Sequence, residues 1–205
     1  MRTKVLLGAA VVLMLIVSVA AIGSNMGFKI SIPLVGNYAA NIVSLPYYNS
    51  YTDSASLWSD LVAAGDTPYQ ISYYDSQNGG WVDYFGRGPF QLPKGGGILI
   101  KVTDASPLPW IVVGSHDPSF SYTLAGNYAV NLVSIPYHTT AVTSQDIWNQ
   151  IVAGGDTPYQ ISMYDSTNGG WVDFFGRGPF TLVPGQALLI KVTDPSPRAW
   201  TPSHY

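Results

Sequence analysis

The stretch "PYQISYYDSQNGGWVDYFGRGPF" at positions 68–90 decides the fold, and it returns at positions 158–180 as "PYQISMYDSTNGGWVDFFGRGPF". In both copies Asn-Gly lies between two runs that are rich in aromatic and β-branched residues, which is the strongest short-range signal for a β-hairpin. We therefore predict a hairpin here, with its return strand beginning at Trp81 in the first copy.

The repeat extends well beyond the hairpin. Positions 34–110 align with 124–200 at a constant offset of 90 residues, and 48 of the 77 positions are identical. Internal self-similarity of this kind indicates a duplicated structural unit. We predict a mainly β protein of two tandem homologous β-sandwich-like domains, each with one short helix. The predicted divisions are a signal peptide 1–21, an N-terminal (donor) strand 22–34, repeat 1 at 35–110, a linker strand 111–124 and repeat 2 at 125–205.

The predicted helix of each repeat has recognisable ends. Asp53 or Ser54 can cap it in repeat 1, and Thr143 with Asp146 forms a variant capping box in repeat 2. Gly65 and its counterpart Gly155 are suited to end the helix in a left-handed conformation. One apolar face is predicted, made of Leu57, Trp58, Leu61 and Val62 in repeat 1 and Ile147, Trp148, Ile151 and Val152 in repeat 2.

The composition excludes several classes of function. Only 10% of the residues are charged, all twelve acids are Asp, and the net charge is −3. Because no basic cluster is present, we do not expect a nucleic acid partner. The absence of cysteine excludes disulfides, thiol nucleophiles and thiolate metal sites.

The N-terminus predicts export. Two basic residues, Arg2 and Lys4, precede an apolar run over 5–17 and then small residues around Ala20 and Ala21. This order is typical of a secretory signal, with cleavage after Ala20 or Ala21. An uncleaved anchor is the alternative, since the run over 5–22 is about long enough to cross a bilayer. In both cases we expect an extracellular or cell-surface location, with membrane contact only through the leader.

An apolar strand is predicted before each repeat. Phe28, Ile30, Ile32 and Leu34 alternate with more polar residues, and Phe120, Tyr122 and Leu124 follow the same parity before repeat 2. After repeat 1 the chain continues into the linker strand, whereas "TPSHY" alone follows Trp200. Repeat 2 is therefore expected to leave an open sheet edge, and such edges attract other chains.

We accordingly predict a structural subunit of an extracellular filament, a homopolymer built by donor-strand insertion. The N-terminal strand of one molecule would enter the next, with Phe28, Ile30, Ile32 and Leu34 as plugs and the surface near Leu188, Ile190 and Val192 as receiver. Such a head-to-tail contact propagates into a fibre. The alternative is that each repeat completes its own sheets with its own strand, which gives a self-contained two-domain protein.

Catalytic and metal chemistry is not predicted. Asp75, Asn78 and Asp83 flank the hairpin turn, but they lack the ligand spacing of a calcium loop. The three histidines, at 116, 138 and 204, are not matched between the repeats and are predicted to be surface residues. No nucleophile triad or phosphate loop is found. We expect no enzyme activity, no cofactor and no metal site.

The aromatic residues suggest a second class of function, a monomeric secreted glycan-binding or adhesive module. Sugar-binding modules stack aromatic rings on saccharide faces, and Arg, Asp and Asn bond the hydroxyls. The candidate residues are Trp81, Tyr84 and Arg87 in repeat 1 and Trp171, Phe174 and Arg177 in repeat 2. The alternative is that these aromatics fill the core and pair across strands.

The motifs "NIVSLP", "YDSxNGGWVD" and "FTLVPGQALLIKV" resemble small β-rich repeat modules of exported bacterial and archaeal surface proteins. Those modules read N-x-V-S-L-P, then a Y-D…G-x-W hairpin, then F-x-L-x-P-G before the final strand. Repeat 1 departs from the pattern with "LPKGGG". The resemblance implies secretion and a non-catalytic module. The proposed strand insertion is similar in architecture to donor-strand filaments, which is an analogy.

Overall fold

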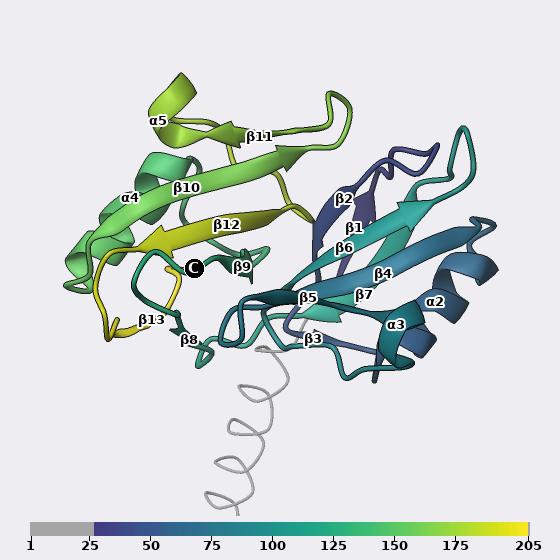
Figure 1. Cartoon of the computed structure of the whole chain (residues 1–205), viewed down its shortest axis with the longest axis horizontal. Helices are drawn as coiled ribbons and strands as arrows, with labels where there is room; N and C mark the ends of the chain where they lie inside the picture. Colours follow the sequence, from purple (N-terminus) through teal and green to yellow (C-terminus); the bar gives the residue numbers. More distant parts are fainter. Residues whose placement is uncertain (1–26, 205) are drawn as a thin grey trace, which may run out of the picture.

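The computed structural model of the chain describes residues 27–204. The predicted signal peptide, 1–21, lies outside the described residues. Within the described part, no helix is both long and apolar enough to span a membrane. The fold is mainly β, with antiparallel sheets in two similar halves and short helices in each (Figure 1). The prediction of a duplicated, mainly β fold is confirmed, but each half has two short helices where one was predicted.

Repeat 1 contains a four-stranded sheet of order β2-β6-β4-β5 and a three-stranded sheet of order β1-β7-β3. Its elements are β1 (Phe28–Ile32), β2 (Asn41–Ser44), β3 (Tyr48–Asn49), α2 (Ser54–Ala63), β4 (Pro68–Asp75), β5 (Gly80–Asp83), α3 (Tyr84–Arg87), β6 (Gly97–Val102) and β7 (Trp110–Ser115). The linker predicted to be a strand thus begins as β7, which lies between β1 and β3.

Repeat 2 reproduces the four-stranded sheet in the order β9-β12-β10-β11. Its smaller sheet is reduced to β8 paired with β13. The elements are β8 (Tyr122–Thr123), β9 (Asn131–Ser134), α4 (Ser144–Ala153), β10 (Pro158–Asp165), β11 (Gly170–Asp173), α5 (Phe174–Arg177), β12 (Ala187–Val192) and β13 (Ala199–Trp200).

The hairpin predicted from Asn-Gly is confirmed as β4 and β5, and its return strand starts at Gly80, one residue before Trp81. The turn has four residues, and Gly79 adopts a positive φ of 70°. The Asp75 carboxylate accepts hydrogen bonds from the backbone N–H of Gln77 and from both the backbone and the side chain of Asn78. Asp75 therefore works as a turn-forming residue, as Asx side chains commonly do.

The helix ends also agree with the sequence. Asp53 caps α2 through the backbone N–H of Ser56, and Thr143 with Asp146 forms the capping box of α4. Gly65 follows α2 with a φ of +99°. One detail differs from the expectation. Val62 is 53% exposed, because the buried stripe of α2 is the narrower one through Leu57 and Leu61.

Each repeat has its own core between its two sheets and its helix. The core of repeat 1 joins Ile30, Ile32 and Leu34 to Trp110 and Val112 on one side and to side chains of β4, β6 and α2 on the other. The core of repeat 2 is built alike around Ile161, Leu188, Ile190 and Val192. Burial of this apolar surface is the main stabilising contribution to both halves.

The repeats meet across an approximate two-fold axis. Ser44 N donates to Gly185 O at 2.8 Å, and Ser134 N donates to Gly95 O at 2.7 Å. The two bonds are equivalent, because Ser44 corresponds to Ser134 and Gly95 corresponds to Gly185 at the 90-residue offset. A third apolar cluster lies at this contact, formed by Ile42, Leu99, Leu132, Ala187 and Leu189. We call it the junction cluster, and it comes from the outward faces of the two four-stranded sheets.

Two glycines make this contact possible. Gly95 and Gly185 have positive φ angles of 75° and 86°. A Cβ atom on Gly185 would lie 2.9 Å from Ile32 of the other repeat, and one on Gly95 would lie 2.4 Å from Phe120. Both the backbone conformation and the close approach therefore require glycine at these positions. The turn before β6 thus packs closely against the segment that precedes repeat 2, and the turn before β12 packs closely against β1, which precedes repeat 1.

Candidate functional site

The predicted donor residues lie within their own repeat in the single chain. β1 pairs with β7 from Phe28 opposite Gly114 to Ile32 opposite Trp110. Ile30, Ile32 and Leu34 are buried in the core of repeat 1, and Phe28 packs against that core. The alternation predicted for this strand is confirmed, with Lys29 and Ser31 exposed.

The predicted receiver residues are covered as well. Leu188, Ile190 and Val192 are buried in the core of repeat 2, on a strand that has β9 and β10 on its two sides. After Trp200 the chain continues along the course that β7 takes in repeat 1, since Thr139 and His204 form a bridge at the positions equivalent to Asn49 and Gly114. The strand pairing at the C-terminal end is short, because β8 and β13 share two residue pairs whereas β1 and β7 share five.

In each predicted glycan-binding set, the tryptophan and the second aromatic residue lie in different surroundings. Trp81 and Trp171 point outward from β5 and β11 and are 44% and 40% exposed. Tyr84 and Phe174 instead stack on the helix residues Trp58 and Trp148, with ring centroids 5.3 Å apart in both repeats. They pack toward the cores. Their rings therefore do not share a platform with the two tryptophans.

The arginines of these sets close short helices. Arg87 lies in the last turn of α3 and Arg177 in the last turn of α5, where a positive charge is favoured by the helix dipole. Both attract the aspartate of the neighbouring hairpin turn. Hydrogen bonds from Asn78, with a smaller contribution from Arg87, hold the pKa of Asp75 below its usual value, and the same arrangement lowers the pKa of Asp165.

Each tryptophan has a different aromatic partner, which sequence reasoning did not place in the site. Tyr74 lies opposite Trp81 across the hairpin, with centroids 5.5 Å apart and rings nearly perpendicular. Tyr164 and Trp171 form the same pair at 5.2 Å. Both tyrosines also pack on the junction cluster. The hairpin register contained the signal, because Tyr74 is directly cross-strand from Trp81.

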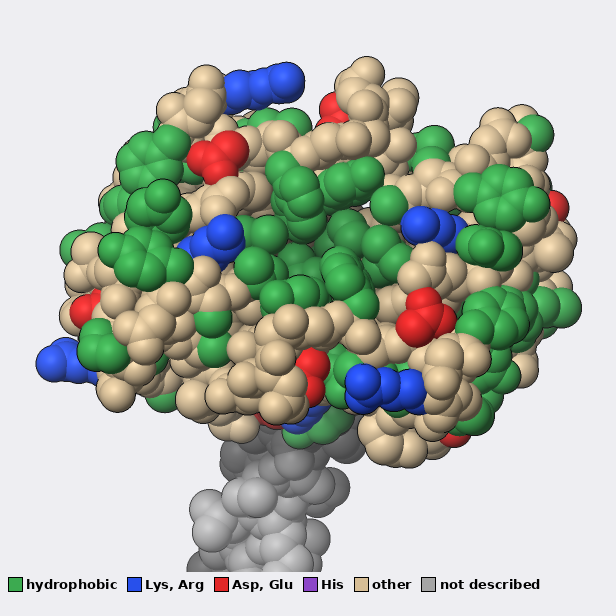
Figure 2. Space-filling view, viewed as in Figure 1, with side chains coloured by type: hydrophobic (Ala, Val, Ile, Leu, Met, Phe, Trp, Pro, Cys, Tyr) green, Lys and Arg blue, Asp and Glu red, His purple; other side chains and the backbone are tan. Residues whose placement is uncertain are grey.

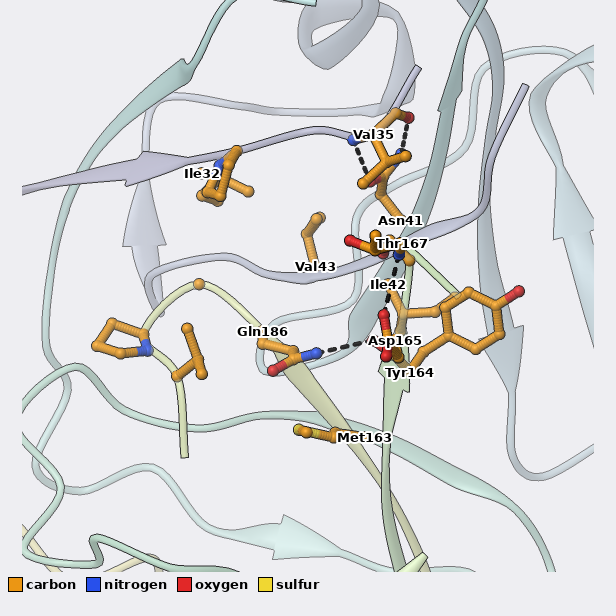
Figure 3. A pocket seen from close by; sticks show the side chains of 15 residues that line it. Ile32, Val35, Asn41, Ile42, Val43, Met163, Tyr164, Asp165, Thr167 and Gln186 are labelled. Atoms are coloured by element: carbon orange, nitrogen blue, oxygen red, sulfur yellow. Dashed lines mark hydrogen bonds between the residues drawn. The ribbon is translucent and has the colours of Figure 1, made fainter. Parts of the chain in front are cut away.

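Two pockets border these tyrosines, one on each side of the junction. The first, of about 300 Å³, is enclosed by β1 and β2 of repeat 1 and by the hairpin and the 183–186 turn of repeat 2 (Figure 3). Ile32, Val43 and Met163 form its apolar part, and Asp165 and Gln186 supply polar atoms. The second, of about 260 Å³, is lined by the equivalent elements with the repeats exchanged, including Tyr74, Asp75 and Gly95.

The space-filling view shows the whole face. Hydrophobic side chains gather in a hollow at its middle, where the two halves meet, and acidic and basic side chains lie on both sides of it (Figure 2). This face thus combines an apolar floor, two small pockets, and an exposed tryptophan on each repeat. The first pocket is mainly apolar with a few polar groups, as is typical of sites for small molecules, and the second has a more polar lining.

The four aspartates that recur in both repeats have structural partners. Asp104 accepts from the backbone N–H of Thr67, and Asp66 accepts from that of Leu108. Asp83 accepts from Gln70 Nε2 at 2.6 Å and also caps α3. Asp75 shapes the hairpin turn. Within the described residues, no cluster of His or Asp side chains is arranged to hold a metal ion.

Comparison of the chain with protein families, with curated proteins and with solved structures finds no match.

Proposed function

We propose that this chain is an exported, non-enzymatic protein of two tandem sandwich-like domains, and that the face between the repeats binds a neutral polysaccharide. The observation that supports the proposal most is the duplicated arrangement of exposed tryptophan, perpendicular tyrosine and small pocket on both sides of one apolar hollow. The protein acts outside the cell or at its surface, without a cofactor.

The chemistry of the face suits a saccharide. The CH groups of a sugar ring pack well on an aromatic face, and Trp81 and Trp171 present large rigid rings whose ordering on binding costs little entropy. Tyr74 and Tyr164 fix the orientation of these rings before a ligand arrives, and such preorganisation favours affinity. The low charge of the chain favours a neutral polymer over a polyanion.

The test is binding of the mature protein to a panel of soluble polysaccharides by affinity electrophoresis, followed by calorimetry on the positives. Trp81→Ala and Trp171→Ala are each expected to weaken binding about tenfold, or about 1.4 kcal/mol, and the double variant is expected to abolish it. Phe85→Ala is the matched control, because Phe85 is an exposed aromatic that contacts Trp58 instead of the face. Binding that survives in the double variant would refute the proposal.

A second candidate is a filament subunit formed by exchange of β1. It is favoured by two features: β1 is an edge strand with β7 as its neighbour, and the short β8–β13 pair is the weakest pairing in the described part of repeat 2. In an assembled filament, the segment 27–34 of one molecule would leave β7 and add to repeat 2 of the next. An edge strand of the same chain and a strand inserted from another molecule make the same kind of main-chain hydrogen bonds.

Negative-stain microscopy of concentrated mature protein tests this candidate. Fibres that are lost when residues 22–34 are deleted, and that the intact protein fails to form in an excess of a peptide of that sequence, would support strand exchange. Uniform particles of monomer size at all concentrations would exclude it. Substitution of Trp81 and Trp171 separates the two candidates, because these residues lie on β5 and β11 and not on β1.

A further inference from the structure

All three histidines of the chain come together at the seam between the repeats, although none matches a histidine in the other repeat. The ring centroids of His116 and His204 are 4.6 Å apart, and those of His116 and His138 are 5.7 Å apart. His116 follows β7 in the linker, His138 lies after β9, and His204 lies near the C-terminus. All three were predicted to be surface residues; they are half-buried, and the clustering was not part of that prediction.

The cluster joins segments that would otherwise be held weakly. Phe28 at the start of β1 stacks on Tyr137 at 4.3 Å and meets His138 edge-on at 5.3 Å. Tyr47 of repeat 1, which is buried against the core of repeat 2, lies 5.9 Å from His116. His204 bridges to Thr139. The start of β1, the linker and the C-terminal segment are therefore all attached to repeat 2 at this place.

The surroundings of His116 are poor in groups that would stabilise a charged imidazole. Both ring nitrogens of His116 are enclosed and lack a hydrogen-bond partner among the described residues. The nearby acid is Asp117, whose carboxylate is already bound by Lys94 Nζ at 2.6 Å and by Ser119. Lys94 adds a positive charge, over the Tyr48 ring. The hydroxyls of Tyr47 and Tyr122 bond to each other, and burial raises the pKa of both, so they stay neutral.

We propose that His116, His138 and His204 form an acid-sensitive clamp that holds β1 and the C-terminal segment on repeat 2 at neutral pH and releases them when His116 takes up a proton. At neutral pH the rings of the cluster pack on one another and on Phe28 and Tyr47. A proton on His116 places a charge in an enclosed site that offers its ring nitrogens no hydrogen-bond partner among the described residues, with the rings of His204 and His138 only 4.6 and 5.7 Å away.

The direction of the pH effect follows from linkage. Burial, together with His204 and His138, lowers the pKa of His116 below its ordinary value of 6.5. The unfolded or released state then binds more protons than the closed state between the lowered pKa and about 6.5. The contribution of the clamp is therefore fully present above about pH 6.5 and is lost as the pH falls through that window.

The test is hydrogen exchange, read by mass spectrometry, on the mature protein between pH 7.5 and 5.0, corrected for the intrinsic pH dependence of exchange. We expect opening of the segment 28–32 and of the segment 199–204 to rise severalfold, roughly threefold or more, because a proton that binds only the open state favours opening as the pH falls. Amides of β12, in the centre of the repeat 2 sheet, serve as the internal reference.

Two variants separate the clamp from general acid sensitivity. His138→Tyr introduces the residue found at the equivalent position of repeat 1, Tyr48, and His116→Gln removes the titrating ring at the centre. Both are expected to reduce the acid response of 28–32 at least threefold while the response of β12 stays the same. An acid response equal to that of the wild type in both variants would overturn the proposal, as would wild-type exchange in 28–32 that does not depend on pH.

Discussion

At the scale of single residues, a buried asparagine side chain in each repeat stabilises the loop before β2 or its counterpart β9. Asn41 is almost fully buried, its Oδ1 accepts from Val35 N at 2.8 Å, and its Nδ2 donates to three backbone carbonyls, those of Val35, Ala39 and Ile100. Asn131 repeats the same bonds. The loop needs this support because Asn37 and Tyr38 both have positive φ angles.

Asn41→Ala is expected to lower the free energy of unfolding by about 2–4 kcal/mol, because several buried backbone groups would lose their partner. Asn131→Ala should give a similar loss in repeat 2. The measurement is urea unfolding followed by tryptophan fluorescence. Asn149→Ala, on the exposed side of α4, is the control and should change stability by about 0.5 kcal/mol or less. Equal effects for Asn41 and Asn149 would contradict this account.

At the scale of elements, the sequence predicts what is decided locally. The hairpin, the caps of α2 and α4 and the alternation of β1 depend on residues a few positions apart, and all three are confirmed. The partners of the strands depend on contacts between distant segments. Thus the sequence indicated an apolar strand at 28–32 but did not show that β7 would pair with it in the same chain.

The candidate site was predicted in part for the same reason. Trp81 and Trp171 were recognised, but the short helix after each hairpin turns Tyr84 and Phe174 toward Trp58 and Trp148. The histidine cluster could not be anticipated, because its members come from the linker, a loop and the C-terminal segment. The spacing of residues along the chain does not predict such tertiary contacts. The pockets depend on how the repeats face each other, which the 90-residue offset alone does not specify.

At the scale of the whole molecule, the contact between the repeats is self-complementary. The bonds Ser44–Gly185 and Ser134–Gly95 and the junction cluster use the same positions from both sides, as in a two-fold symmetric dimer. A chain limited to residues 22–120 is therefore expected to associate in pairs. Sedimentation equilibrium measures this, and Leu99→Asp, which places a charge in the junction cluster, should return it to monomers. A half-length chain that is monomeric at all concentrations would contradict this reading.

The near two-fold symmetry has a consequence for any polymer that lies across the hollow. A polysaccharide has a reducing and a non-reducing end, whereas this face offers similar contacts in both directions. If the proposed function holds, a polysaccharide chain could then bind in either orientation, and the protein would bind parallel and antiparallel chains alike. Binding without a preferred orientation suits a protein that cross-links an extracellular matrix.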